Sequence, residues 1–341
     1  MEAHFAARAS AVLNSMNADL NVDITISIAS YNTRELLRAC LDSLLALRDE
    51  VSLQIIVADN GSRDGTIEML QIEYSNNVTL LETGGNLGYG LANNAAFEIA
   101  RGRYFVALNS DTTMPRGTLK TLLNFMDAHP EVGAVGAQLL NTDGTNQTSH
   151  GCDMTWRGLL EEQFGVQKLR GKLAKSSTRS EAIEIAAENN EPFEVEQICG
   201  ACQFVPREVW LQVGGYDPKY FMYHEDVDLN VRIRKAGWKC FFVPQARVFH
   251  HLGASSERSW RSRARMVSAL NKSRYYAVSK TEGRARGEVL KAVFLFGALL
   301  RLMNWTLRAL VRPNQLHRER VRLFREVLRQ TARADRNDPR K

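Results

Sequence analysis

The chain has 341 residues, of which 24% are charged and 44% hydrophobic, and a formal net charge of +6. These fractions exclude a disordered chain, and the length predicts one large domain with an appendage. The charge is unevenly placed: from Ser255 to Lys341 there are 22 Lys and Arg against 7 Asp and Glu, whereas the first 254 residues have 22 against 31. This asymmetry predicts that the basic end meets an anionic surface.

Residues 1–22 form an expected N-terminal extension without a long apolar run after a basic start, so we expect no secretory signal. No stretch reaches the about 20 uninterrupted apolar residues that a spanning helix needs. We therefore expect the five cysteines to be reduced thiols in the cytosol. The lone C-x-x-C formed by Cys199 and Cys202 is more typical of packing residues than of a zinc or redox site.

Strands and helices alternate through the first 140 residues. Apolar runs rich in β-branched residues predict strands at 23–30, 53–58, 78–81, 104–108 and 132–140. Apolar residues at helical spacing predict helices after Thr33, which would cap the first of them, after the turn at 59–65, and at 91–100 and 119–128. This alternation predicts an α/β fold with a Rossmann-like, mostly parallel sheet flanked by helices. Ligands of such sheets lie outside the carboxyl ends of the strands.

The second half of the chain is less regular. Residues 141–196 are polar and lack clean periodicity, which predicts a variable insertion with one or two helices, one of them at 179–187. A second αβ portion follows, with a helix at 225–236 that ends at Gly237 in a left-handed cap. From residue 258 the pattern is helical and basic. We therefore expect a domain at 23–256 and a helical C-terminal appendage at 257–341.

Two loops at strand ends have residues suited to a nucleotide. Asp59 follows the second strand, where its carboxylate can accept hydrogen bonds from a base or ribose. The same stretch, DNGSRDG, is equally typical of a turn with a helix cap at Asp64. The glycines of residues 84–90 run in the order G-x-x-G-x-G and follow the third strand, which excludes a Rossmann oxidoreductase. This loop can still form a wall against a donor nucleotide.

Acidic and histidine motifs follow other predicted strands. Asn109 and Asp111 have the spacing of a D-x-D motif with an amide in the first place, and oxygen ligands of this kind bind divalent cations on a diphosphate. A solvated loop aspartate is the alternative. Glu225, Asp226 and Asp228 begin a helix. Carboxylates at this position can either stabilise the helix N-terminus or supply a catalytic general base. His250 follows a short strand at 247–249 and suits either a ligand or the core.

Together and in this order, these motifs resemble family 2 glycosyltransferases over residues 24–256. The resemblance implies the GT-A fold and an inverting transfer from a nucleoside-diphosphate sugar. LNSD, HEDVDL and VFHHLGASS are most similar to bacterial rhamnosyltransferases of lipid-linked glycans, which implies dTDP-L-rhamnose as the donor in cell-envelope synthesis. The matching stretches are ISIASYNTRELL, IIVADNGSRDGT, GGNLGYGLANNAA, YFVALNSD, ICGACQFVPREVW, VGGYDPKYFMYHEDVDLNVRIRKAGW and VFHHLGASS.

The resemblance also implies roles for single residues. Asp226 would be the catalytic base, supported by Glu225 and Asp228, and Asp59 would read a pyrimidine. Asp111 and His250 would bind Mg²⁺ or Mn²⁺, with Asn109 in place of an aspartate making the site less negative. The residues implied for the sugar-donor site are Ser30, Tyr31, Asn32, Asp59, Asn86, Gly88, Asn93, Asn109 and Ser110, and those implied beside the acceptor are Gly200 and Ala201.

Two alternatives use the same motifs. One is a UDP-hexose transferase of the same fold, and the other is a non-catalytic nucleotide-sugar-binding subunit of a membrane assembly complex. The acids at 226 and 111 favour an enzyme. We expect no nucleic-acid partner, because the strongest feature of the basic region is apolar rather than interleaved with aromatic residues.

Residues 289–311 are strongly apolar but contain Arg301 and Arg308. A spanning helix would bury Arg301 near the bilayer centre at about 2.5–3.5 kcal/mol. We therefore expect a helix lying in the plane of an anionic membrane, on its cytoplasmic face. A helix packed onto the catalytic domain is the alternative. The side chains expected to enter the membrane are Phe294, Leu295, Leu299, Leu302, Trp305 and Leu310.

Overall fold

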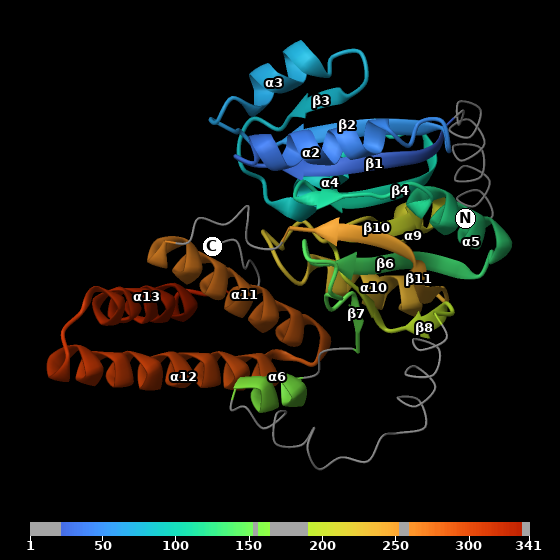
Figure 1. Cartoon of the computed structure of the whole chain (residues 1–341). Helices are drawn as coiled ribbons and strands as arrows, with labels where there is room; N and C mark the ends of the chain where they lie inside the picture. Colours follow the sequence, from blue (N-terminus) through green and yellow to red (C-terminus); the bar gives the residue numbers. More distant parts are fainter. Residues whose placement is uncertain (1–21, 153–155, 164–189, 252–258, 336–341) are drawn as a thin grey trace.

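The computed structural model describes residues 22–152, 156–163, 190–251 and 259–335, and its centre is a mixed sheet (Figure 1). The first 151 residues supply β1 (Val22–Ser30), α2 (Arg34–Leu45), β2 (Leu53–Asp59), α3 (Thr66–Glu73), β3 (Thr79–Glu82), α4 (Tyr89–Phe97), β4 (Gly102–Asn109), β5 (Thr112–Thr113), α5 (Thr118–Ala128), β6 (Val132–Leu140) and β7 (His150–Gly151). The rest supplies α6 (Trp156–Gln163), β8 (Phe193–Val195), β9 (Gln197–Ile198), β10 (Cys202–Pro206), α9 (Arg207–Val213), α10 (Glu225–Lys235), β11 (Lys239–His250), α11 (Trp260–Thr281), α12 (Arg284–Val311) and α13 (Gln315–Ala332).

The strand order is β3-β2-β1-β4-β10-β6-β11-β5, with β8 beside β11. The first four strands are mutually parallel, and β6 is parallel to β11. The predicted alternation and the mostly parallel sheet are confirmed, with element ends shifted by at most three residues in the first half. The position of β10 was not predicted: it lies antiparallel between β4 and β6. Its turn carries residues 199–201 to the edge of the sheet where β4 ends.

Two apolar cores cover the two faces of the sheet. On one face, Ile24, Ile26 and Ile28 of β1 share a core with side chains of α2 and α5. On the other face, side chains of β2 and β4 share a core with α4, α9 and α10. Burying each such Leu or Ile contributes about 1.5–3 kcal/mol. The two cores fix the strands, and therefore fix the polar residues at the strand ends.

Two predicted helix caps behave differently in the structure. Thr33 makes no capping bond, because its hydroxyl donates to Ser110 Oγ at 3.0 Å instead. Asp64 accepts from the backbone N–H of Arg34 at the start of α2 as well as from Thr66 in α3. At the end of α10, Gly237 has a φ of +96°, which confirms the left-handed cap. The helix predicted at 179–187 and the extension at 1–21 lie outside the described residues.

The C-terminal helices α11, α12 and α13 lie together beside the sheet (Figure 1). Leu159 of α6 shares a small core with Val278, Leu290 and Phe294, so the predicted insertion contacts the C-terminal helices. Phe294 is therefore buried in protein, and the expectation that it enters a membrane is wrong. Within the described ranges, α12 alone is long and apolar enough, by length and composition, to cross a membrane. Only 22% of its most apolar stretch is buried, unlike the core helix of a soluble protein.

The helix α11 is also bonded to α10 and to the loop before it. Lys280 Nζ lies 2.7 Å from Asp217 Oδ2 and 2.6 Å from Asp228 Oδ1. Ser273 Oγ donates to the backbone oxygen of Met222 at 3.0 Å. The C-terminal helices are thus attached to the segment that precedes the acidic motif.

Candidate active site

A cleft of about 220 Å³ opens at the carboxyl ends of β1 and β4. Parallel pairing places Ser30 beside Asp59 and Ala29 beside Asn109, so the ends of β1, β2 and β4 meet at one edge. The structure thereby brings together most of the predicted sugar-donor residues. The lining residues are Ala29, Ser30, Tyr31, Thr33, Asn60, Asn86, Gly88, Tyr89, Asn109, Ser110, Asp111, Phe221 and Met222.

Asp59 has a buried oxygen with an unused acceptor. Its Oδ1 accepts the backbone N–H groups of Gly61 at 3.0 Å and Ser62 at 2.8 Å. Its Oδ2 is buried and has no hydrogen-bond partner among the described residues. A buried carboxylate oxygen without a donor is costly.

Asn60 joins the two loops of the cleft. Its Oδ1 accepts from Leu87 N at 3.2 Å and from Thr83 Oγ1 at 3.1 Å, and its Nδ2 donates to Gly88 O at 3.3 Å. Gly88 has a φ of +89°, and a Cβ there would lie 2.0 Å from Phe221 O. Only glycine fits this approach. No site role for Asn60 was predicted from the sequence, although its place directly after Asp59 at a strand end was a usable signal.

Besides Asp59, two predicted sugar-donor residues, Asn93 and Asn32, lie outside the lining of the cleft. Asn93 is fully buried, accepts from Ser27 Oγ at 2.7 Å and donates to Tyr89 O at 2.9 Å. The structure therefore corrects the expectation that Asn93 lines the nucleotide site: it holds the start of α4 against β1. Asn32, at a φ of +53°, accepts from Arg63 N at 2.7 Å and braces the loop after β2.

Asp111 and His250 come together because β11 pairs with β5, which places His250 beside Thr112. His250 Nε2 lies 3.3 Å from Asp111 Oδ1 and 3.3 Å from Asn109 Nδ2, and both Asp111 and His250 are buried. No cluster of three or more His, Cys, Asp or Glu that could hold a metal occurs in the described ranges. One carboxylate and one imidazole still fit Mg²⁺ or Mn²⁺ when diphosphate oxygens and water complete the shell.

Asp226 lies at the start of α10 with both carboxylate oxygens held. Its Oδ2 accepts from Gly200 N and its Oδ1 from Val227 N, each at 2.8 Å. Gly200 O in turn accepts from the hydroxyl of Tyr89, a residue of the cleft wall, at 2.7 Å. Burial raises the pKa of Asp226, and the two N–H donors oppose that rise. Asp226 is not in the cleft wall itself and is connected to it through Gly200 and Tyr89.

Glu225 and Asp228 differ from Asp226 in their surroundings. Glu225 is buried, and its Oε2 has no hydrogen-bond partner in the part of the chain that the structure describes. Burial, followed by the charge of Asp226, raises its pKa to about 8. It is therefore the protonated member of the pair at neutral pH. Asp228 binds Arg232 Nε at 2.7 Å and Lys280 Nζ at 2.6 Å. Its carboxylate is committed to α11, which corrects the expectation that Asp228 assists the base.

The residues expected beside the acceptor lie between the metal pair and the acids. Ala201 is buried, and its backbone oxygen accepts from Asn109 N at 3.0 Å. A Cβ at Gly200 would lie 2.9 Å from Asp226 Cβ, so the close approach requires glycine. Burial raises the pKa of the Cys199 thiol to about 11 and that of Cys202 to about 12, which suits packing residues rather than reactive thiols.

Comparisons with known proteins identify similar chains. The model of a family described as Glycosyl transferase family 2 matches residues 25–207. An N-acetylglucosaminyl-diphospho-decaprenol L-rhamnosyltransferase of Mycobacterium tuberculosis is 35% identical over 243 residues, which is 68% of this chain and 76% of the relative. Rhamnosyltransferase WbbL of Escherichia coli is 24% identical over 80% of this chain and 99% of its own length.

A solved structure extends the likeness to the fold. The mannosyltransferase PcManGT from Pyrobaculum calidifontis, in complex with GDP-Man and Mn²⁺, superposes with a TM-score of 0.50. It is 17% identical, and the match covers 92% of this chain and 88% of that one. At this identity the likeness is evidence for the fold alone.

Proposed function

This chain belongs to glycosyl transferase family 2 and has the GT-A fold, and from that premise we propose that it transfers L-rhamnose from dTDP-L-rhamnose to a lipid-linked glycan. The observation that carries the proposal is the 35% identity to a named rhamnosyltransferase along 76% of that protein. The sheet edge supports it, because Asp111 lines the cleft there with His250 beside it, and Asp226 is connected to the cleft wall through Gly200 and Tyr89.

The sugar nucleotide binds across the ends of β1, β2 and β4. Asp59 Oδ2 accepts the N–H of the thymine ring, while Asn86 and Gly88 form the wall of the nucleotide site. Asp111 and His250 would hold a divalent cation, which when bound would neutralise charge on the departing diphosphate. Asn109 and Ser110 line the same part of the cleft and position the diphosphate by hydrogen bonds.

Asp226 is the base. As the acceptor hydroxyl oxygen attacks the anomeric carbon opposite the diphosphate, Asp226 takes the hydroxyl proton. The N–H groups of Gly200 and Val227 fix the carboxylate and favour its ionised form, against the burial that raises its pKa. Glu225, protonated beside it, adds no second negative charge. Direct displacement of this kind inverts the anomeric configuration.

A panel of sugar nucleotides tests the proposal. The purified protein, with Mn²⁺, is mixed with dTDP-L-rhamnose, UDP-N-acetylglucosamine, UDP-glucose or GDP-mannose, and thermal stabilisation and transfer to a polyprenyl-diphospho-N-acetylglucosamine acceptor are measured. We expect stabilisation and transfer with dTDP-L-rhamnose. Transfer from a UDP-hexose alone would replace the rhamnosyl assignment, and binding without transfer to any acceptor would favour a non-catalytic subunit.

We also propose that α12 lies on the cytoplasmic face of an anionic membrane. One side of α12 packs against α6, α11 and α13. The other side exposes an apolar stripe whose members recur every three, four or seven residues, as one face of a helix requires. The apolar stripe consists of Val289, Phe296, Leu300, Met303, Leu307 and Leu310.

Positive charge around the apolar stripe supports an anionic lipid surface as its partner. Each arginine near such a surface contributes about 1 kcal/mol, less in salt. A spanning arrangement would instead place Arg301 inside the bilayer, at about 2.5–3.5 kcal/mol. An in-plane helix lets the stripe enter the lipid while the arginines meet headgroups. The exposed arginines of this region are Arg301, Arg308 and Arg312 on or directly after α12, and Arg318, Arg322, Arg325 and Arg329 on α13.

A further inference from the structure

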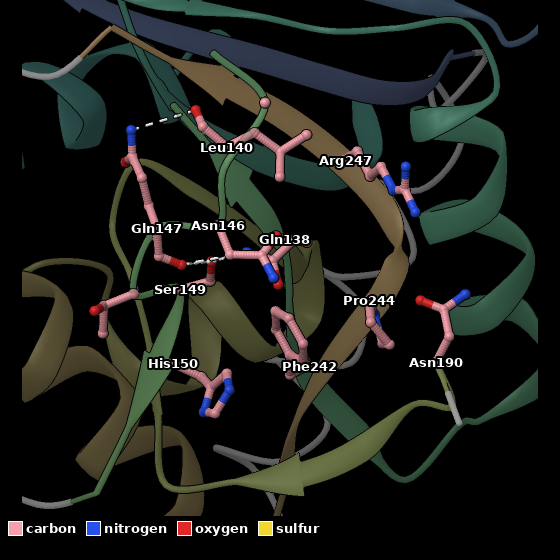
Figure 2. Close-up of a pocket in the computed structure, with 12 residues that line it drawn as sticks. Gln138, Leu140, Asn146, Gln147, Ser149, His150, Asn190, Phe242, Pro244 and Arg247 are labelled. Carbon is pink, nitrogen blue, oxygen red and sulfur yellow. Dashed lines mark hydrogen bonds between the residues drawn. The ribbon is translucent and has the colours of Figure 1, made fainter. Parts of the chain in front are cut away.

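A second, larger pocket of about 670 Å³ lies beside the hairpin that follows β6, and Figure 2 shows its lining. Most of its side chains are polar, and those of Gln138, Gln147 and Ser149 hold the hairpin, residues 141–149, to the sheet. One of them, Gln147, also contacts a residue of the candidate metal pair. Gln147 Oε1 lies 3.1 Å from Nδ1 of His250, the ring nitrogen that does not face Asp111.

The orientation of the Gln147 amide is fixed by its other contacts. Gln147 Nε2 lies 2.7 Å from His250 O, 2.9 Å from Asn141 Oδ1 and 3.3 Å from Leu140 O, the last drawn as a dashed line in Figure 2. All three partners are oxygens that only accept, so the NH₂ end of the amide faces them. The carbonyl end therefore faces His250, and Nδ1 must carry the hydrogen that it accepts.

The contact between Gln147 Oε1 and His250 Nδ1 determines which ring nitrogen of His250 has a free lone pair. With hydrogen on Nδ1, the neutral imidazole has its lone pair on Nε2, the atom 3.3 Å from Asp111 Oδ1. Histidines that bind metals typically donate their other N–H to an oxygen, and losing that partner typically weakens metal binding 10- to 100-fold. We propose that Gln147 is a positioning residue that holds His250 in the tautomer and orientation required for the metal. The proposal rests on the use of Asp111 and His250 as ligands.

Gln147 also anchors the hairpin, and the structure offers a control for that role. Gln138 Nε2 donates to Leu139 O at 2.7 Å, Ser149 Oγ at 3.1 Å and Gln147 O at 3.2 Å. It therefore holds the same hairpin without touching His250. Gln138→Leu removes the anchoring alone. Gln147→Leu removes both roles, and Gln147→Glu keeps an acceptor for Nδ1–H but cannot donate to the three oxygens.

The test measures Mn²⁺ binding by electron paramagnetic resonance in the presence of dTDP, together with dTDP affinity without metal and the melting temperature. We expect Gln147→Leu to weaken Mn²⁺ binding about 10- to 100-fold. Gln147→Glu and Gln138→Leu should bind Mn²⁺ within about threefold of wild type even where melting falls, a difference below one kcal/mol. Metal-free dTDP affinity should stay unchanged in all three.

Three results would overturn the proposal. Gln147→Leu could bind Mn²⁺ as wild type does, or Gln147→Glu and Gln138→Leu could weaken binding as much as Gln147→Leu, which would reduce Gln147 to an anchor. Absence of Mn²⁺ binding in the wild type would remove the ligand pair and this role with it. The transferase function would still be tested separately, by the panel of sugar nucleotides.

Discussion

The carboxylate of Asp226 accepts a 2.8 Å hydrogen bond from the backbone N–H of Gly200, which ties the first turn of α10 to the turn before β10. The two segments come from different parts of the chain and meet beside the cleft. Because a second N–H, from Val227, holds the other oxygen, the carboxylate has little freedom to rotate. This rigidity suits a base that must face one acceptor hydroxyl.

Removing this base should slow turnover without loosening the sugar-nucleotide site. Asp226→Asn keeps an oxygen for the Gly200 N–H but cannot take a proton, so we expect kcat to fall by about 10² to 10⁴. The Kd for dTDP should stay near the wild-type value. Asp228→Asn is the matched control: it weakens the contact with Lys280 and should lower Tm while most turnover remains. Near-normal turnover of Asp226→Asn would reject this base and leave Glu225 to be tested.

The buried Glu225 should make stability depend on pH. Its folded pKa of about 8 exceeds the ordinary value of 4.5. Between these values the unfolded chain releases the proton and the folded chain keeps it, so this group costs stability as pH rises from 4.5 to 8. The Tm of Glu225→Gln should therefore rise relative to wild type between pH 5 and pH 8. Parallel Tm curves for the two proteins would show that Glu225 ionises normally in the fold.

The close contact of Gly88 with the loop before α10 should be required for nucleotide binding. In Gly88→Ala the Cβ would meet Phe221 O, so the loop that lines the cleft must move. We expect the Kd for dTDP to rise at least about tenfold, or 1.4 kcal/mol. Gly84→Ala is the control, because its φ is +75° but nothing lies within 4 Å of its Cβ. Equal losses in both variants, measured by calorimetry, would mean that backbone strain and not the contact matters.

Metal removal should stop the reaction. We expect excess EDTA to abolish transfer and Mn²⁺ to restore it, because without a cation the carboxylate of Asp111 would face the departing diphosphate with its negative charge uncompensated. Asn109→Asp adds a carboxylate beside His250 Nε2 and should lower the Mn²⁺ concentration needed for half-maximal activity. Full transfer in excess EDTA contradicts the metal site.

The apolar stripe of α12 should carry the protein to anionic vesicles. Wild type should float with vesicles that contain phosphatidylglycerol and be only partly released by high salt, since both apolar burial and charge contribute. Met303→Gln with Leu307→Gln should reduce flotation strongly. Ile72→Gln is the control, because Ile72 on α3 is 80% exposed and lies outside the stripe. If the wild type does not float with the vesicles, or if Ile72→Gln reduces flotation as much as the double substitution in the stripe, the stripe has another partner.

The sequence predicted features that depend on local pattern. Asp59 and Asn109 end buried strands, and parallel strand ends must meet, so their proximity follows from alternation alone. The pairing of β10 between β4 and β6 does not follow, because strand neighbours are chosen by packing over long separations. The same limit explains Gln147, which lies 103 residues from His250 in a polar hairpin with no motif.

Side-chain direction was the other feature that the pattern could not determine. Asp226 and Asp228 stand two residues apart at one helix start and look equivalent in sequence. In the fold one accepts from Gly200, and the other pairs with Lys280, 52 residues further along the chain. Asn93 was misassigned for a related reason: an asparagine near a glycine-rich loop suits a ligand, but here its amide joins Ser27 to Tyr89 inside the core.

The bond of Lys280 to Asp217 and Asp228 affects how this protein can be recombined with its relatives. A chimera joined at residue 257 would separate Lys280 from both carboxylates and leave Asp228 with Arg232 alone. A junction at Gly283, where φ is +96° between α11 and α12, keeps that ion pair within one parent. The α12–α13 hairpin is then the exchanged unit, and its contacts across the junction must be matched. Leu159 of α6 and Val278 of α11 share a core with Leu290, and Ala264 of α11 shares one with Ala298.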